Sequence, residues 1–126
     1  MKLEIGMYVR TKKGIAKIMI LDDLDNVAWT DKKDIYFGIK SDDGLKWYVD
    51  DDGTVLSEPS FNIIDLIEVG DYVNGSQVCQ IKKDEHGRTW IYTDSNYKYG
   101  YLEEDIVDVV TKEQFDREKY VIERND

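Results

Sequence analysis

Short apolar stretches alternate with polar turns along the chain, and several stretches recur in the same order. The Glu-Ile-Gly-Met-Tyr-Val of residues 4–9 returns as Glu-Val-Gly-Asp-Tyr-Val at residues 68–73, an offset of 64. Later correspondences have an offset of 43: Trp47 with Trp90, and residues 62–67 with residues 105–110. Blocks that recur in one order predict an internal duplication.

Each copy has the pattern of several short strands joined by tight turns. Apolar and β-branched residues dominate the expected strands, and polar residues with glycine separate them. The turns fall at Asp42-Asp43-Gly44, at Asn74-Gly75 and at His86-Gly87, and Asn-Gly is a strong hairpin signal. Four or five strands in about 45 residues are typical of a small SH3-like barrel. We therefore expect a mainly β fold of two tandem small SH3-like barrel repeats, followed by a short C-terminal helix.

The first copy is the longer one, because the offset between the copies falls by roughly twenty residues after Ile18. This difference predicts an insertion at about residues 19–38. Two β-prone segments lie within it, residues 27–29 (Val-Ala-Trp) and residues 35–37 (Ile-Tyr-Phe), with polar residues between them. The pattern favours an extra hairpin.

The correspondences divide the chain into three parts. Residues 1–67 are the first repeat, residues 68–110 the second, and residues 111–126 a short helix and tail. Residues 111–114 (Thr-Lys-Glu-Gln) have a capping pattern, in which Thr111 caps the first turn and Gln114 stands three positions later. This pattern predicts a short helix from Lys112 to about Lys119.

The charge balance narrows the class of partner. The chain has 27 acidic and 17 basic side chains, a net charge of -10. A duplex repels such a surface, so direct binding to double-stranded nucleic acid is not expected, whereas basic partners are favoured by long-range attraction. The alternative is that the acidic surface only keeps the protein in solution.

The cellular compartment is inferred from what the sequence lacks. No apolar run approaches 18 residues, so no membrane partner is expected. The N-terminal residues lack the apolar stretch of a signal peptide, and Cys79 is the single cysteine. We therefore expect a cytoplasmic protein.

Catalysis is disfavoured because no acid–base pair is apparent. The one histidine, His86, lies in a predicted turn with no residue to orient it. Cys79 aligns with Ala16 of the first copy, which predicts a buried, small apolar role within a strand. We expect no enzyme and no catalytic residue.

Metal and cofactor sites are not expected either. The Asp50-Asp51-Asp52-Gly53 segment resembles a calcium loop, but Gly53 at the sixth position would put Tyr48 at the first and Pro59 at the twelfth. One histidine and one cysteine cannot supply a zinc site, and no glycine-rich phosphate loop is present.

Aromatic residues provide the first candidate contact surface. Tyr97, Tyr99 and Tyr101 alternate with other residues, and in a strand this spacing places all three on one side. Such a row is either part of the barrel core or an outward aromatic surface suited to protein recognition. Trp29 and Tyr36 of the expected insertion are further candidates for partner contact.

Acidic residues provide the second candidate, as a spaced array of negative charge that would attract a basic partner. The candidate residues are Asp22, Asp23, Asp25, Asp31 and Asp34 in the insertion, Asp50, Asp51 and Asp52 in a turn, and Glu103 and Glu104 before the last strand.

Basic residues near the first turn leave an alternative open. Arg10, Lys12, Lys13 and Lys17 lie close together in the sequence, and SH3-like units of the KOW and Tudor kinds bind RNA or proteins. Four basic residues beside an acidic body predict at most weak affinity for phosphate groups.

Three segments carry a resemblance to a known group of proteins. Residues 5–18, residues 69–75 (Val-Gly-Asp-Tyr-Val-Asn-Gly) and residues 110–115 (Val-Thr-Lys-Glu-Gln-Phe) resemble small uncharacterised proteins of Firmicute phages and mobile elements. The resemblance covers both copies and the tail but not the insertion, and it supplies no activity or site residues. It implies a genetic context in which small acidic proteins often block host machinery, as some anti-CRISPR proteins do by occupying a basic groove that holds nucleic acid.

The leading hypothesis is a non-enzymatic, phage-type protein that inhibits or adapts a host protein through acidic and aromatic surface. The alternative is a ligand-sequestering module with a pocket at a repeat or subunit interface. A weak nucleic-acid-binding module of the KOW or Tudor kind is the second alternative.

Overall fold

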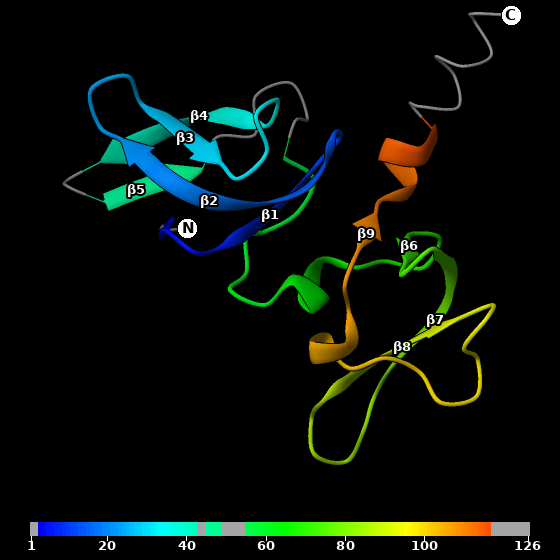
Figure 1. Ribbon diagram of the computed structural model, residues 1–126. Coiled ribbons are helices and arrows are strands. Elements are labelled where there is room, and N and C mark those ends of the chain that lie inside the picture. The colour runs from blue at the N-terminus through cyan, green and yellow to red at the C-terminus, as the bar shows by residue number, and fades with distance from the viewer. Residues whose placement is uncertain (1–2, 43–44, 49–54, 117–126) are drawn as a thin grey trace, which may run out of the picture. The chain divides into compact units, whose positions relative to one another are not determined.

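The chain divides into two compact units, Met1–Asn62 and Ile63–Asp126 (Figure 1). The structure is a computed structural model that describes residues 3–42, 45–48 and 55–116. The boundary lies before residue 63, whereas the repeat pattern predicted it after residue 67. Residues 63–67 belong to unit 2 because Ile64 and Ile67 pack in the hydrophobic core of that unit.

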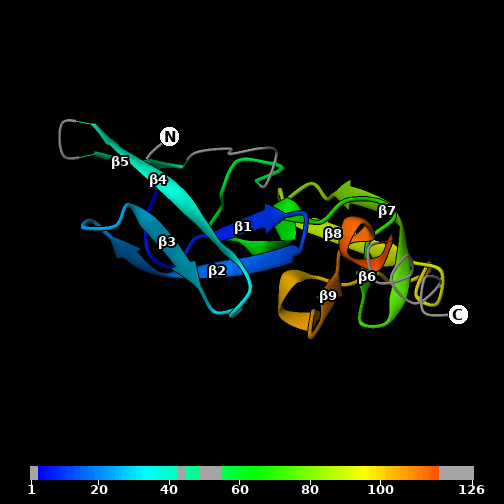
Figure 2. The same cartoon turned by 90° about the horizontal axis from the view of Figure 1, so that it is seen from above.

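Unit 1 contains an antiparallel sheet in which each strand pairs with the next along the chain. The strands are β1 (Tyr8–Thr11), β2 (Gly14–Asp22), β3 (Val27–Thr30), β4 (Tyr36–Asp42) and β5 (Leu45–Tyr48). A bulge between Ile18 and Ile20 bends β2, whose curvature is visible in Figure 1. The first part of β4 pairs with β3 and its last part with β5, and Figure 2 shows this long strand from above.

The core of unit 1 follows from the alternation of side chains along these strands. Val9, Ile18, Ala28 and Phe37 are buried together, and each lies on the inner face of its strand. A bridge between Thr11 and Val55 pairs β1 with the chain that follows β5, and a bridge between Tyr8 and Ser60 pairs it further along.

Unit 2 is smaller in its regular structure. Its elements are the 3-10 helix η2 (Ile63–Leu66), β6 (Tyr72–Val73), β7 (Ser76–Lys83), β8 (Thr89–Thr93), the 3-10 helix η3 (Glu103–Asp105) and β9 (Val109–Val110). The sheet has the order β8-β7-β6-β9. Its core consists of Ile64, Ile67, Val73, Val78 and Ile91.

The predicted C-terminal helix begins where the capping pattern placed it. Residues 112–116 are helical, and the hydroxyl of Thr111 accepts a hydrogen bond from the backbone N–H of Gln114 at 3.1 Å. The prediction of a mainly β fold with one short C-terminal helix is therefore confirmed. Within the described ranges, no helix is long and apolar enough to cross a membrane.

The predicted turns at residues 74–75 and 86–87 are also confirmed, whereas Asp43 and Gly44 of the third predicted turn lie outside the described residues. β6 and β7 are joined by Asn74 and Gly75 alone, with φ values of 51° and 84°, the left-handed geometry of a type I′ turn. His86 and Gly87 lie in the turn between β7 and β8. In unit 1, residues 27–29 pair with residues 36–38 as a hairpin.

The two units share a strand-pairing pattern. Tyr8 pairs with Lys17 as Tyr72 pairs with Gln77. β2 has a bulge between Ile18 and Ile20, and β7 has one between Val78 and Gln80. After the bulge, Ile20 pairs with Trp29 in unit 1 and Gln80 pairs with Tyr92 in unit 2. The last shared pairings join Ala28 to Phe37 and Ile91 to Tyr101.

This pattern corrects the predicted position of the insertion. β3 has a counterpart in β8, so the hairpin within residues 19–38 is shared by both units. The extra segment of unit 1 begins after Phe37, with the remainder of β4 and β5. Trp47 therefore does not match Trp90, whose counterpart by pairing is Val27. The repeat pattern matched the two tryptophans wrongly because the β4–β5 and β7–β8 hairpins both combine a polar turn with an aromatic strand.

Candidate binding surfaces

An exposed row of large side chains crosses the outer face of the sheet in unit 1. Ile20 of β2 lies opposite Trp29 of β3, and Trp29 lies opposite Tyr36 of β4. The neighbours Ala28 and Phe37 are buried, so the alternation of the strands turns these three side chains outward. Their exposed fractions are 56% for Ile20, 41% for Trp29 and 54% for Tyr36. We call Ile20, Trp29 and Tyr36 the outer row.

The two aromatic rings of the outer row form a pair. Their centroids are 5.1 Å apart and their planes are tilted by 35°. An aromatic pair of this geometry contributes about 0.5–1.5 kcal/mol beyond the area it buries, and it holds both rings in place. Water still covers much of both rings, which is a favourable starting point for binding an apolar group.

Acidic residues lie at both ends of β3. At one end, an Asp22 carboxylate oxygen accepts hydrogen bonds from the backbone N–H groups of Leu24 (3.0 Å) and Asp25 (3.2 Å). The remaining carboxylates of this turn, Asp23 and Asp25, belong to exposed residues. The β2–β3 turn therefore presents negative charge beside the outer row.

The other end of β3 is mixed in charge. The Asp31 carboxylate accepts a hydrogen bond from the Lys17 backbone N–H at 2.9 Å. The Asp34 carbonyl oxygen accepts one from the Lys13 ammonium group at 3.0 Å, which joins the β1–β2 turn to the β3–β4 turn. Lysines offset the acidic residues here, so the negative field is stronger at the β2–β3 turn.

The three candidate tyrosines of unit 2 do not form a row. Residues 97–99 form a turn rather than a strand, so the predicted alternation is wrong. Tyr97 and Tyr99 are each 73% exposed, whereas Tyr101 is half-buried against the core and pairs with Ile91. Tyr97 and Tyr99 are therefore surface residues, whereas Tyr101 is partly in the core.

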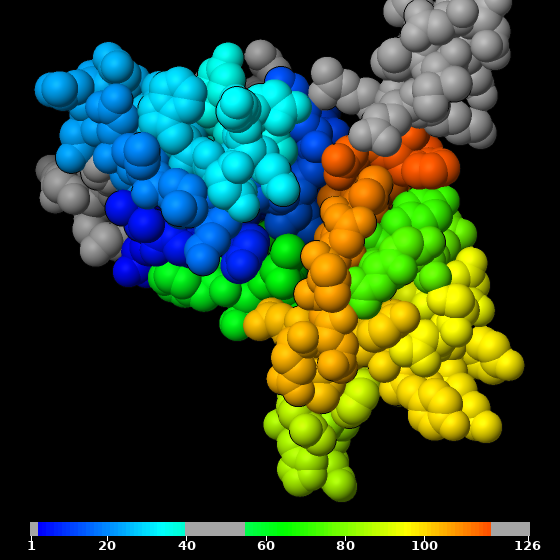
Figure 3. All heavy atoms as spheres, viewed as in Figure 1, coloured from blue at the N-terminus to red at the C-terminus, as the bar shows by residue number. Residues whose placement is uncertain are grey.

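The turn that carries Tyr97 and Tyr99 is fixed by hydrogen bonds at its base. The Thr93 hydroxyl accepts from the Asn96 backbone N–H, and the Asn96 side chain donates to the Gly100 carbonyl oxygen, both at 3.1 Å. Gly100 has a φ of 75°, and a Cβ atom there would lie 3.0 Å from the Tyr92 ring. We call residues 94–100 the tyrosine loop, drawn in yellow in Figure 3, where it stands out from the surface of unit 2.

The remaining acidic candidates have different surroundings. The Glu103 carboxylate accepts a hydrogen bond from the Ile64 backbone N–H at 3.1 Å, which is a contact within unit 2. Glu104 is exposed in η3. Asp50, Asp51 and Asp52 lie outside the described residues. Within unit 1, the structure therefore brings together Trp29 and Tyr36.

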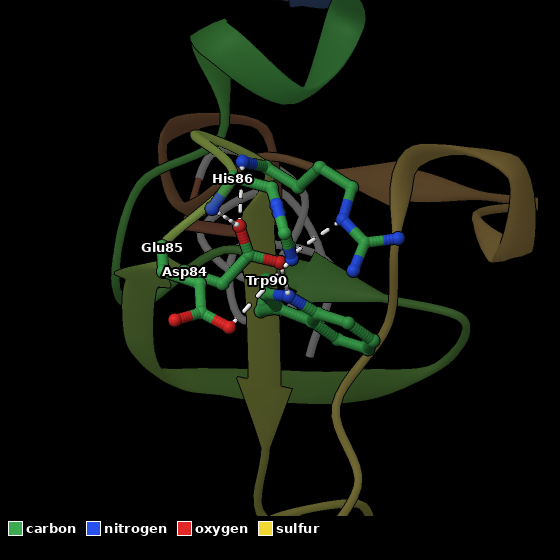
Figure 4. Close-up of polar contacts among 5 residues, drawn as sticks. Asp84, Glu85, His86 and Trp90 are labelled. Atoms are coloured by element: carbon green, nitrogen blue, oxygen red, sulfur yellow. Dashed lines mark hydrogen bonds and ion pairs between the residues drawn. The ribbon is translucent and has the colours of Figure 1, made fainter.

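An acidic residue that the sequence analysis did not single out organises the β7–β8 turn. The Asp84 carboxylate accepts hydrogen bonds from the Trp90 indole N–H (2.9 Å), the Arg88 side chain (3.0 Å) and the backbone N–H groups of His86 (2.8 Å) and Arg88 (3.0 Å), as Figure 4 shows. These hydrogen bonds lower the pKa of Asp84 from 3.8 to about 2, and the bond from Trp90 has the largest effect. Asp84 therefore stays ionised and holds the turn, a structural role.

His86 and Cys79 are both exposed. His86 lies beside Glu85, with 3.6 Å between its Nε2 atom and a carboxylate oxygen. The prediction of a buried Cys79 is wrong, because Cys79 occupies the bulge of β7 and its counterpart is Met19 in the bulge of β2. Its sulfur lies 3.4 Å from the Tyr92 carbonyl oxygen. Among the described residues, no group of three or more His, Cys, Asp or Glu residues is placed to hold a metal ion.

Comparison of the chain with protein-family models, with curated proteins and with solved structures finds no match.

Proposed function

We propose that the chain is a non-enzymatic binding protein of two SH3-like units that recognises a partner protein through the outer row of unit 1. The observation that carries this proposal is the Trp29–Tyr36 pair, whose ring centroids lie 5.1 Å apart on the outer face of a sheet that packs its core cluster on the inner face. Tryptophan and tyrosine contribute much of the binding energy at protein interfaces, since they bury a large area with little loss of side-chain freedom.

The charge supports a partner with a basic surface. The acidic β2–β3 turn lies beside the outer row, and the chain as a whole has a net charge of -10. Long-range attraction would speed association with a basic protein, and the outer row would provide the short-range contact. The other end of β3 carries both lysines and aspartates, so the orientation of the partner would follow the β2–β3 turn.

A narrower proposal concerns the consequence of binding. An acidic protein that covers a basic surface or groove of a host protein would exclude nucleic acid from it, which is the inhibitory role that the phage resemblance implies. The test is competition: added chain should displace a labelled oligonucleotide from the purified partner. Binding without displacement would contradict inhibition and leave the binding function intact.

A crosslinking experiment tests the surface itself. A photo-reactive phenylalanine analogue at position 36 should give a discrete crosslinked protein in a bacterial host, whereas the same analogue at Phe61, another exposed aromatic of unit 1, should not. With the purified partner, Trp29→Ala should weaken binding about tenfold or more, as expected for a central aromatic contact. Equal affinity of the Trp29→Ala variant and the unaltered chain would overturn the proposal.

The contribution of charge has its own control. Asp23→Lys and Asp25→Lys reverse the sign of the turn and leave the Asp22 hydrogen bonds in place. Both substitutions should slow association, and raising the salt concentration should do the same for the unaltered chain. Binding that is insensitive to salt and to both substitutions would contradict a basic partner.

A second candidate function is supported by the contact of Lys13 with the Asp34 carbonyl oxygen. This bond brings the exposed Lys12 and Lys13 together with the exposed Lys32 and Lys33 at one end of unit 1. Such a cluster would support weak binding of a single-stranded nucleic acid. Fluorescence anisotropy with a labelled oligonucleotide at low salt should detect it, and Lys32→Gln with Lys33→Gln should abolish it. An oligonucleotide that does not bind at low salt would rule this candidate out.

A further inference from the structure

We infer that the tyrosine loop of unit 2 is a second interaction surface, which fits the basic face of a folded partner protein. It is independent of the outer row, since it lies in the other unit and shares no residue with it.

Exposure and rigidity occur together in this loop. Tyr97 and Tyr99 are among the most exposed large side chains of the described residues, yet the backbone that carries them is fixed by Thr93 and Asn96 at one end and by Gly100 at the other. Fixing a loop before binding reduces the entropy that binding must overcome. A rigid loop with two projecting rings is therefore better suited to contact than a flexible one of the same composition.

The composition of the loop matches a known type of protein-binding loop. Ser95, Asn96, Tyr97, Tyr99 and Gly100 are five of its seven residues. Tyrosine with serine, glycine and asparagine dominates the binding loops of antibodies, where tyrosine supplies rigid contact area with a polar tip and the small residues supply hydrogen bonds. A folded protein surface fits two such rings because each tyrosine is 73% exposed and offers both an apolar ring and a hydroxyl group.

The charge of unit 2 determines the sign of the partner. Residues 63–126 account for seven of the ten net negative charges of the chain. Within the loop, Asp94 and Lys98 offset each other, and the Lys98 ammonium group lies 5.7 Å from the centre of the Tyr99 ring. The wider acidic field therefore attracts a basic protein, and Lys98 is the local charge that opposes it.

Selection from a library of a small folded scaffold, with one randomised face of unbiased charge, tests this inference on the full chain. Binders are sorted by the single substitution that weakens them: Tyr97→Ala, Tyr36→Ala in the outer row, or Val107→Ser at a residue of unit 2 that is 90% exposed. We expect a class of binders that loses about tenfold or more in affinity with Tyr97→Ala and with Tyr99→Ala, and that is enriched in lysine and arginine.

Two further variants test whether binding depends on the fixed conformation and charge of the loop, rather than only on two exposed tyrosine rings. Asn96→Ala removes the bond to the Gly100 carbonyl oxygen and keeps both tyrosines, so the loop binders should weaken severalfold while the melting temperature changes little. Lys98→Glu should strengthen these binders about threefold. If the affinity of the loop binders does not change with Asn96→Ala, the loop is not preorganised for binding. If their affinity falls with Lys98→Glu, the partner surface is not basic. A selection that yields a Tyr36 class and no Tyr97 class would overturn the inference and leave the outer row unaffected.

Discussion

The two units use one strand-pairing pattern to present aromatic residues in different ways. In unit 1, Trp29 lies opposite Tyr36 on the face of the sheet. The pairing of Ala28 with Phe37 matches that of Ile91 with Tyr101, so the positions of Trp29 and Tyr36 correspond to Tyr92 and Gly100 in unit 2. Where unit 1 has a second ring, unit 2 has no side chain.

This difference explains where each unit exposes its rings. Without a side chain at Gly100, the Tyr92 ring lies against the backbone and is half-buried, so Tyr92 has no ring opposite it like the one that Tyr36 places opposite Trp29. The most exposed rings among the described residues of unit 2 lie instead in the loop before Gly100, at Tyr97 and Tyr99. The replacement of an aromatic residue by Gly100 therefore distinguishes unit 2, with its projecting tyrosines, from unit 1, with its flat aromatic pair.

The largest expected effect comes from a core position that the two units fill differently. Asp71 occupies the position of Met7, is fully buried, and accepts hydrogen bonds from the backbone N–H groups of Glu68 (2.7 Å) and Lys112 (2.9 Å). Asp71→Ala leaves both N–H groups without this acceptor, and we expect a loss of about 2–4 kcal/mol in the free energy of unfolding. Met7→Leu, the matched control, should cost less than about 1.5 kcal/mol. Urea unfolding of both variants checks the contrast, and equal losses would contradict it.

Gly100→Ala tests the comparison at its centre. The φ of 75° disfavours any residue with a Cβ atom, and the new methyl group would meet the Tyr92 ring at 3.0 Å, so we expect a loss of about 1–3 kcal/mol. Tyr36→Ala at the matched position removes an exposed ring and should cost about 1 kcal/mol or less. Thermal unfolding measures both, and a Gly100→Ala variant as stable as the unaltered chain would show that the glycine is not required.

The local elements could be predicted from the sequence because their signals are local. Asn74 and Gly75 form the expected tight turn, and Thr111 caps the expected helix, since both depend on the chemistry of adjacent residues. The hairpin that contains Trp29 and Tyr36 was predicted for the same reason.

The register between the units could not be predicted, because it depends on contacts between distant residues. Trp47 and Trp90 follow similar polar turns, and only the strand pairing shows that they are not equivalent. The tyrosine loop has the alternation of a strand, but the hydrogen bonds of Asn96 and the positive φ of Gly100 make it a turn. The sequence does contain a signal for that turn, an Asn followed four residues later by a Gly.

The β-hairpin turns of the two units allow a comparison that depends on pH. Asp22 and Asp84 each accept two backbone N–H groups in their turns, but Asp84 also accepts from Trp90 and Arg88. Because its pKa falls from 3.8 to about 2 in the folded chain, ionised Asp84 stabilises the fold above pH 3.8, and this stabilisation is lost as the pH falls through about 2. Asp84→Asn should remove this part of the pH dependence. Carboxyl NMR titration should give a midpoint near 2 for Asp84, and a midpoint near 3.8 would contradict the hydrogen-bonded turn.

The smallest effect is expected where each unit covers its glycine turn with a different side chain. Phe61 lies over Gly6 in unit 1, whereas the Lys112 side chain lies over Gly70 in unit 2 and its ammonium group is 2.8 Å from the Glu68 carboxylate. Both partners of this ion pair are substantially exposed, so Lys112→Gln should cost only about 0.5 kcal/mol, and the cost should shrink as salt is added. The hydrogen bond to Glu68 raises the pKa of Lys112, so the pair persists at neutral pH.

Phe61→Ala should cost about 1 kcal/mol at every salt concentration, because its contact is apolar. Urea unfolding at low and high salt separates the two covers, and a salt-independent loss for Lys112→Gln would show that its methylene groups, rather than its charge, cover the turn.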